Sequence, residues 1–341
     1  MMNYLSFLFF VVAVQPINAQ LFGGQIKRSS AIISQLDCNG AIQSGNLIVG
    51  QVASGVSVSV TYTGGNGGFY PAQSIASTGV TGLTGNLPLG TLAIGAGSIT
   101  LTITGTPSAA GNANFLISLG GQSCTLTLLV YGVQPQYPPN TVHCNGIVTI
   151  VNDVTNPTTG KTWMDRNLGA STVAFTPGAN YVGSIYQWGR RSDGHQCYNS
   201  PTTSTLSQLD QPTHGNFILA PNAPCDWRSP QNANLWQGVN GVNNPCPSGY
   251  RLPTETELNN ERLSWTTANE AGAAASPLKL PGGGLFRNNI DGTSVSINYP
   301  GCYWSSTVFG SNSRYLIFDY SSSSINTACR AYGHAVRCIK N

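Results

Sequence analysis

The feature that most constrains this chain of 341 residues is a long stretch without formal charge. From Cys38 to Asn152 there is no Asp, Glu, Lys or Arg, whereas nearly all the charge and all six Trp follow from Asp153 onward. Apolar residues make up 40% of the chain, so both parts can bury a hydrophobic core. The shift in composition therefore predicts two domains.

The low charge also limits the kinds of partner. Charged residues are 8% of the chain and the net charge is +3, so no basic patch can neutralise a run of phosphates. We expect no nucleic-acid partner, and the weak charge does not direct the protein to acidic membranes. Solubility must come from hydroxyl and amide side chains.

The uncharged stretch has the pattern of short β-strands. Residues 56–63 (VSVSVTYT) alternate apolar and hydroxyl side chains with period two, as a strand with one buried face does. Residues 98–104, 114–119 and 124–130 repeat this pattern, and turn clusters such as 64–68 (GGNGG) separate them. These signals predict a small β-sandwich over residues 38–131.

One turn in this region carries a family resemblance. Residues 103–111 (ITGTPSAAG) resemble the Gly-Thr-Pro turn of bacterial Ig-like repeats, which implies an Ig-like β-sandwich that acts as a spacer or stalk. A surface without charge also permits a second behaviour, in which such domains stack edge to edge.

The N-terminus is typical of an exported protein. Residues 1–19 contain an apolar run and end in the small residue Ala19, a pattern that predicts a signal peptide, with residues 20–37 forming an N-terminal segment. No later segment reaches the roughly 18 apolar residues of a membrane helix, so we expect no transmembrane segment. The predicted location is secreted or at the cell surface.

Nine cysteines in an exported chain predict disulfides, because oxidising compartments preserve them. Cys38 and Cys124 lie near the ends of the predicted sandwich and are expected to clamp it. The other seven are an odd number, so at least one stays unpaired within the chain. No CxxC pair or His-rich spacing indicates zinc.

A Pro-rich linker at residues 132–140 leads to a second domain, residues 141–341, with six motifs in a fixed order. They are residues 162–169 (TWMDRNLG), 186–190 (YQWGR), 226–231 (DWRSPQ), 244–258 (NPCPSGYRLPTETEL), 303–307 (YWSST) and 336–340 (VRCIK). This ordered set resembles the Fibrobacter succinogenes major paralogous domain family (FISUMP), which is similar to the C-type lectin-like fold. The predicted fold class is therefore mainly β, with an Ig-like sandwich followed by an α+β, C-type lectin-like domain.

The resemblance implies a Cys246–Cys338 disulfide that ties the end of this domain to its middle. Cys302 and Cys329 lie in two predicted late strands and form a plausible second pair. Cys144, Cys197 and Cys225 then compete for one bond, with Cys197 joined to Cys144 or Cys225.

One helix start can be located from the residues alone. Thr254 with Glu257 three residues later predicts a capping box. Arg251, just before it, is expected to anchor a loop rather than bind a ligand.

The sequence gives no strong sign of catalysis or metal binding. The formylglycine-generating relatives of this fold need a reactive cysteine pair, but the loop between Cys329 and Cys338 does not resemble theirs. Asp319, His334 and residues 321–324 can be assembled into a triad only by chance, and we expect His334 at the surface. The calcium-binding motifs of C-type lectins are absent from the sequence. We therefore predict no catalytic residue, metal or cofactor.

The best candidate for a binding face is the segment 299–332, because Tyr brings rigid contact area while Ser, Asn and Arg bring adaptable hydrogen bonds. The candidate residues are Tyr303, Asn312, Ser313, Arg314, Tyr315, Tyr320, Arg330 and Tyr332. The alternation at residues 315–320 is equally typical of an ordinary strand with one wet face, and Trp304 is expected in the core.

Two hypotheses for function follow. The first is a non-catalytic, adhesin-like binding protein whose lectin-like domain recognises an extracellular glycan or a surface protein without calcium. The second is a structural surface protein that self-associates through its uncharged sandwich.

Overall fold

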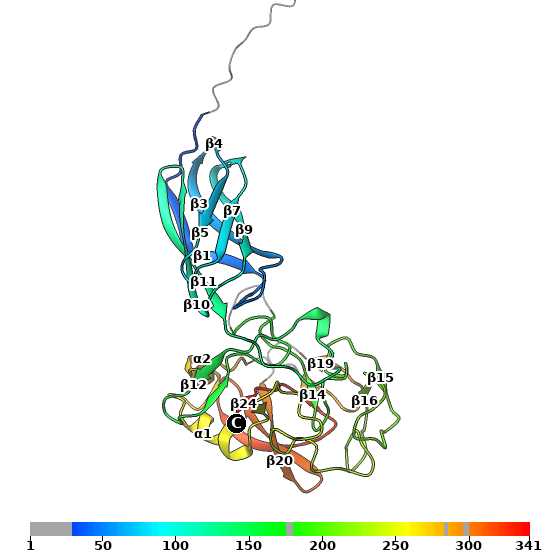
Figure 1. Ribbon diagram of the computed structural model, residues 1–341. Helices are drawn as coiled ribbons and strands as arrows, with labels where there is room; N and C mark the ends of the chain where they lie inside the picture. Colours follow the sequence, from blue (N-terminus) through cyan, green and yellow to red (C-terminus); the bar gives the residue numbers. More distant parts are fainter. Residues whose placement is uncertain (1–28, 175–179, 283–285, 296–299) are drawn as a thin grey trace, which may run out of the picture.

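A computed structural model describes residues 29–174, 180–282, 286–295 and 300–341. The protein is mainly β, and its strands fall into two groups that pair only within themselves. Figure 1 shows an elongated unit, residues 29–131, above a rounder unit, residues 141–341. We call these the sandwich unit and the loop-rich unit. The predicted signal peptide, residues 1–19, lies outside the described residues.

The sandwich unit contains two main sheets, antiparallel except for the parallel pair β2–β11, and one short strand pair. The first sheet has the order β1-β3-β9-β7-β5, and its strands are Gln35–Ser44, Val56–Asn66, Ile94–Gly105, Leu83–Leu87 and Gln73–Ala76 respectively. The second has the order β2-β11-β10-β6, with strands Leu47–Ile48, Gln122–Tyr131, Gly111–Leu119 and Thr78–Gly79. The short strands β4 (Phe69–Tyr70) and β8 (Gly90–Thr91) form the separate pair.

The period-two alternation explains how the two main sheets pack. In β3 the side chains of Val58 and Val60 are buried, and Val58 lies opposite Leu101 of β9. The inner face of the other sheet supplies Phe115, opposite Leu126, to the same core. Each such side chain contributes about 1.5–3 kcal/mol on burial. The four strands predicted at 56–63, 98–104, 114–119 and 124–130 are present as β3, β9, β10 and β11.

The Gly-Thr-Pro turn follows β9 and requires its glycine. Gly105 has φ +102°, and a Cβ there would lie 2.2 Å from the carbonyl oxygen of Gly82. A larger residue at this position would therefore be strained.

Over its described residues, the loop-rich unit has four small sheets, two short α-helices and one 3₁₀ turn. The sheet orders are β12-β13-β24-β17, β14-β23-β18-β19, β20-β21-β22 and β15-β16. The strands are Asp153–Thr155 (β12), Thr162–Met164 (β13), Tyr186–Gln187 (β14), Thr202–Thr203 (β15), Phe217–Ile218 (β16), Tyr250–Arg251 (β17), Phe286–Arg287 (β18), Ser294–Val295 (β19), Gly301–Phe309 (β20), Asn312–Phe318 (β21), Ser323–Cys329 (β22), Gly333–His334 (β23) and Ile339–Lys340 (β24). The helices are the 3₁₀ turn η1 (Cys144–Gly146), α1 (Glu255–Leu263) and α2 (Glu270–Ala275).

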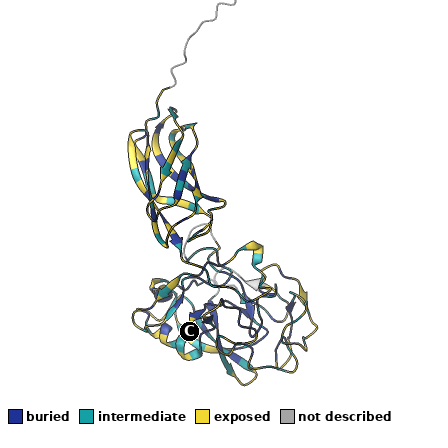
Figure 2. Ribbon diagram, viewed as in Figure 1, coloured by how far each residue is buried: buried dark blue, intermediate teal, exposed yellow. Residues whose placement is uncertain are grey.

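Buried tryptophans hold the long connections of this unit together. The indole N–H of Trp188 donates to the Ser305 carbonyl at 2.8 Å, and that of Trp227 donates to the Trp188 carbonyl at 2.7 Å. Trp304 likewise donates to Tyr186 at 2.7 Å and is fully buried, as expected for a core residue. Each ring thus fills the interior while its N–H donates to a backbone carbonyl. Figure 2 shows buried residues running through these loops.

The predicted capping box is confirmed at the start of α1. The Thr254 hydroxyl accepts the Glu257 N–H at 3.2 Å, and the Glu257 carboxylate accepts the Thr254 N–H at 2.8 Å. Arg251 donates two hydrogen bonds to the same carboxylate, at 2.7 and 2.8 Å. Together with the N-cap bonds, this pair lowers the pKa of Glu257 to about 2, although burial acts in the opposite direction.

Four disulfides are present, and one predicted pairing is wrong. Cys38–Cys124 and Cys246–Cys338 join as expected, and Cys197 pairs with Cys144 rather than Cys225. Cys329, however, pairs with Cys225, which leaves Cys302 as a buried free thiol.

The register of the β20-β21-β22 sheet explains this difference. Cys302 lies opposite Ile317, and Ile317 lies opposite Ser324, five residues along β22 from Cys329. Five residues of strand span roughly 16 Å, well beyond the roughly 7 Å Cα separation that a disulfide allows.

The predicted linker, residues 132–140, packs onto the loop-rich unit instead of spanning open solvent. Gln134 accepts the Val151 N–H at 2.6 Å, and the Tyr137 hydroxyl donates to the Thr149 carbonyl at 2.8 Å. Arg166 of the loop-rich unit donates to the hydroxyl of Tyr131, the last residue of β11, at 3.1 Å. Side-chain hydrogen bonds therefore connect the two units directly.

Among the described residues, no helix is both long and apolar enough to cross a membrane. The four disulfides fit a protein that matures in an oxidising compartment.

Candidate functional site

The strongest candidate site is a cleft of about 280 Å³ in the loop-rich unit. We call it the 204–231 cleft. Its apolar walls are Leu206, Leu219, Ala220, Pro221, Ala223, Pro224 and Pro230, and its polar lining is Ser204, Asn222, Asp226, Arg228, Ser229 and Gln231. A concave apolar surface with a few polar groups is the usual form of a ligand site.

Three segments form the cleft because backbone hydrogen bonds align them. The parallel pair β15–β16 brings residues 204–206 beside 219–221, with the Leu219 N–H donating to Thr203 at 2.7 Å. The Ser207 N–H donates to Trp227 at 2.9 Å, which brings residues 226–231 beside the first segment. The Cys225–Cys329 disulfide then fastens this wall to β22.

Asp226 fixes the inner end of the cleft. Its buried carboxylate accepts the backbone N–H of Arg228 at 3.1 Å and the Gln231 amide at 3.0 Å, and it lies 3.5 Å from the guanidinium of Arg330. Burial raises the pKa of Asp226 and lowers the pKa of Arg330. Burying the Asp226–Arg330 pair costs desolvation energy, and its hydrogen bonds hold it in place. We therefore interpret the pair as one that fixes the position of the cleft wall.

Arg228 supplies the cation at the rim of the cleft. Its guanidinium forms an ion pair of 2.7 Å with the partly exposed Asp210 and donates to the Pro230 carbonyl. Asp210 is partly exposed and also accepts the Asn232 amide at 3.0 Å, so solvent screens this ion pair only in part, and 14% of the Arg228 side chain stays exposed to a ligand. The cleft can therefore take an apolar group with a carboxylate or other acceptor beside it.

The structure does not bring the predicted binding residues of segment 299–332 onto one surface. Tyr303, Ser313 and Arg330 are 1%, 0% and 2% exposed, so the expectation that they contact a ligand is wrong. Tyr303 faces the core, where its hydroxyl donates to the Pro281 carbonyl at 3.0 Å. Arg330 instead supports the 204–231 cleft from behind, through Asp226.

The other predicted residues lie in different surroundings. Tyr320 is 85% exposed at the turn after β21, while Asn312 is half-buried at the start of that strand. Arg314 lies 3.3 Å from Glu255 and 4.0 Å from the centre of the Phe309 ring. Tyr315 and Tyr332 are half-buried beside His334.

His334 is buried, so the expectation of a surface histidine is also wrong. Its ring lies 4.3 Å from that of Trp304, 4.6 Å from Tyr315 and 5.7 Å from Phe286, measured between centroids. Neither ring nitrogen has a side-chain partner, and burial lowers the pKa of His334 to about 3. The ring therefore behaves as one more aromatic of the core at neutral pH.

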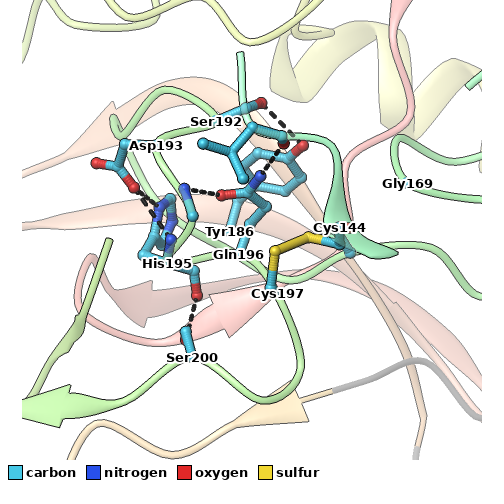
Figure 3. Close-up of a disulfide and its surroundings, with 12 residues drawn as sticks. Cys144, Gly169, Tyr186, Ser192, Asp193, His195, Gln196, Cys197 and Ser200 are labelled. Carbon is cyan, nitrogen blue, oxygen red and sulfur yellow. Dashed lines mark hydrogen bonds and ion pairs between the residues drawn. A yellow bond between two sulfur atoms is a disulfide. The ribbon is translucent and has the colours of Figure 1, made fainter. Parts of the chain in front are cut away.

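A buried Asp-His pair lies near the Cys144–Cys197 disulfide (Figure 3). His195 Nδ1 lies 2.7 Å from Asp193, and Nε2 accepts the Gln187 backbone N–H at 3.0 Å. The nearby Ser200 hydroxyl donates to the His195 carbonyl, not to the ring. The ring thus has no nitrogen free to take a proton from Ser200, and the arrangement is structural.

The charges around this pair agree with a structural role. Burial lowers the pKa of His195 to about 4, with Arg190 acting in the same direction. Although burial opposes it, the His195 ring and the Arg190 guanidinium hold the pKa of Asp193 below its usual value. Over the residues that the structure describes, no group of three or more His, Cys, Asp or Glu is placed to hold a metal ion.

In comparisons with known proteins, no family model, no curated protein and no solved structure matches this chain. The function must therefore be argued from the residues themselves.

The DWRSPQ motif, residues 226–231, contributed to the predicted fold only through a family resemblance and was not predicted as a site. The signal that could have marked it as a site is the pairing of Asp226 and Arg228 with apolar Pro-containing segments, at 219–224 and at Pro230. The other wall of the cleft comes from residues 204–206, and only the fold brings it alongside.

Proposed function

We propose that the chain is an exported, non-catalytic binding protein, adhesin-like in role, that recognises an extracellular partner through the 204–231 cleft. The fold we assign is an Ig-like sandwich that presents a C-type lectin-like domain of the FISUMP family. The ordered motifs of the loop-rich unit and the Gly-Thr-Pro turn of the sandwich support this assignment.

The observation that carries the proposal is the cleft itself, in which aliphatic and prolyl side chains surround one guanidinium, that of the partly buried Arg228. Its volume suits a single side chain or one small ring. Its walls contain no aromatic ring on which a sugar could stack. Of the two partner classes, glycan and protein, these walls favour a protein that inserts an apolar side chain next to a carboxylate.

The test is binding of the mature chain, residues 20–341, to a panel of surface proteins and polysaccharides, with and without EDTA. We expect binding that EDTA does not change and that Arg228→Ala weakens at least tenfold, the factor for about 1.4 kcal/mol. Leu206→Trp, which fills the cleft without removing a charge, should weaken binding as well. Arg262→Ala on α1 is the matched control, because it removes the same side chain outside the cleft.

Two results would contradict the proposal. One is binding that survives both Arg228→Ala and Leu206→Trp, and the other is the absence of any ligand in the panel. In the second case the structural role, with self-association of the uncharged sandwich, would become the better hypothesis. Light scattering at rising concentration measures that association directly.

A further inference from the structure

A second, larger cleft lies where the two units meet, and nothing in the proposed function uses it. It has a volume of about 980 Å³. One wall is the β1–β2 region of the sandwich unit, residues 39–46, with Leu129 and Tyr131 of β11. The other wall comes from the loop-rich unit, where it includes residues 165–166 and 171–173. We call it the interunit cleft.

The polar groups of the interunit cleft are almost all neutral. Amide side chains line it at Asn39, Gln43, Asn46 and Asn180, and hydroxyls line it at Ser44, Ser171 and Thr172. Gln43, Asn180 and Ser171 each donate one hydrogen bond to a carbonyl of the chain, so they offer a ligand their remaining donors and acceptors. Ile42, which is 73% exposed, provides an aliphatic surface among them. An exposed apolar side chain surrounded by amides matches the mixed C–H and hydroxyl surface of a sugar.

The two charged groups in this cleft neutralise each other. Arg166 donates to both carboxylate oxygens of Asp165, at 2.7 and 3.0 Å. Its remaining bonds go to the Ser171 carbonyl at 3.0 Å and the Tyr131 hydroxyl at 3.1 Å. Four of the five guanidinium N–H groups are therefore used, and because Asp165 pairs with Arg166 the cleft offers no unpaired charge to an ionic ligand.

The backbone at this edge is poorly suited to adding a peptide strand. The β1–β3 register is broken between Asp37 and Ile42. The N–H groups of Asn39 and Gly40 both donate to the Asp37 carboxylate at 3.0 Å. A bulged edge whose donors are already occupied blocks regular strand pairing, so recognition falls to the amide side chains.

From these contacts we propose that the interunit cleft binds a neutral oligosaccharide chain, held by amide and hydroxyl hydrogen bonds from both units. The proposal does not depend on the 204–231 cleft, because the two clefts share no residue. It adds a ligand class that the sandwich would help to recognise, instead of acting only as a spacer.

The test is calorimetric titration of the full mature chain with cellohexaose, xylohexaose and mannohexaose, and with a six-residue Ser/Thr peptide as the competing ligand class. We expect at least one sugar to bind and Asn39→Ala/Gln43→Ala to weaken its binding about 30-fold, the factor for two lost hydrogen bonds of roughly 1 kcal/mol each. Gln51→Ala/Asn112→Ala is the matched control, because it removes two exposed sandwich amides outside the cleft. Arg228→Ala should leave sugar binding unchanged, which separates this proposal from the proposed function.

Hydrogen exchange gives a second readout that needs no variant. Bound sugar should slow exchange in residues 39–46 and also in residues 165–173, since the cleft has one wall from each unit. Slowing on one wall only, binding of the peptide but no sugar, or equal losses in the cleft variant and its control would each overturn the proposal. The absence of binding to all three sugars would overturn it as well.

Discussion

The free cysteine gives the sharpest test of the structure. Cys302 is buried, and burial raises the pKa of its thiol to about 12. At pH 8 a free cysteine with pKa near 8.5 is about one quarter thiolate, whereas a pKa of about 12 leaves roughly one thiolate in ten thousand. The native thiol therefore has roughly 2,000-fold less thiolate than free cysteine and should react far more slowly, with steric exclusion slowing it further.

The assay is labelling with a thiol reagent, first in native buffer and then in guanidinium chloride without reductant. We expect no fast labelling of the native protein and one equivalent after unfolding, abolished in Cys302→Ala. A non-reducing digest should join the peptides of Cys225 and Cys329. Fast native labelling would refute the burial of Cys302, and a peptide that joins Cys302 to Cys329 would refute the register of β20-β21-β22.

Three further predictions concern stability. Cys38→Ser/Cys124→Ser removes a bond between residues 86 apart and should lower the free energy of unfolding by about 4–5 kcal/mol in the chain-entropy description, as measured by denaturant titration; no change would contradict it. Thr254→Ala removes the N-cap of α1 and should cost about 1 kcal/mol in the same assay, whereas a Thr254→Ser variant should retain most of the stability. His334 stays neutral in the folded state down to pH about 3 but gains a proton near pH 6.5 when unfolded, so its contribution is complete above pH 6.5 and is lost as the pH falls towards 3. His334→Phe should therefore reduce the loss of stability between pH 6.5 and 3, and an unchanged pH profile would contradict the burial of this ring.

Much of the sandwich unit could be predicted from the sequence, because its signals are local. A period-two alternation such as that of residues 56–63 requires one buried face whatever its partner is, and β3 buries that face. The same holds for the capping box, since Thr254 and Glu257 are three residues apart and need nothing else to meet. Predictions that depend on residues within one turn or one strand are therefore confirmed.

Features that depend on the register between distant strands could not be predicted from local sequence patterns. Seven cysteines in the second half allow many pairings, and the register of three strands, which no local pattern encodes, keeps Cys302 away from Cys329, which pairs with Cys225 instead. The burial of the tyrosines in segment 299–332 likewise depends on long-range packing, which the sequence pattern does not give. Tyr303 is buried and Tyr320 is exposed because helix α1 and the core cover only part of the sheet.

The sequence by itself determined the uncharged β-rich half, the odd cysteine and the start of α1, because composition and short spacings suffice for these. Only the tertiary structure decided where a ligand can sit. The 204–231 cleft joins three separated segments through backbone hydrogen bonds, and the interunit cleft joins two units through Arg166 and Tyr131. A concave site is a property of how distant segments pack, and that packing depends on the whole fold.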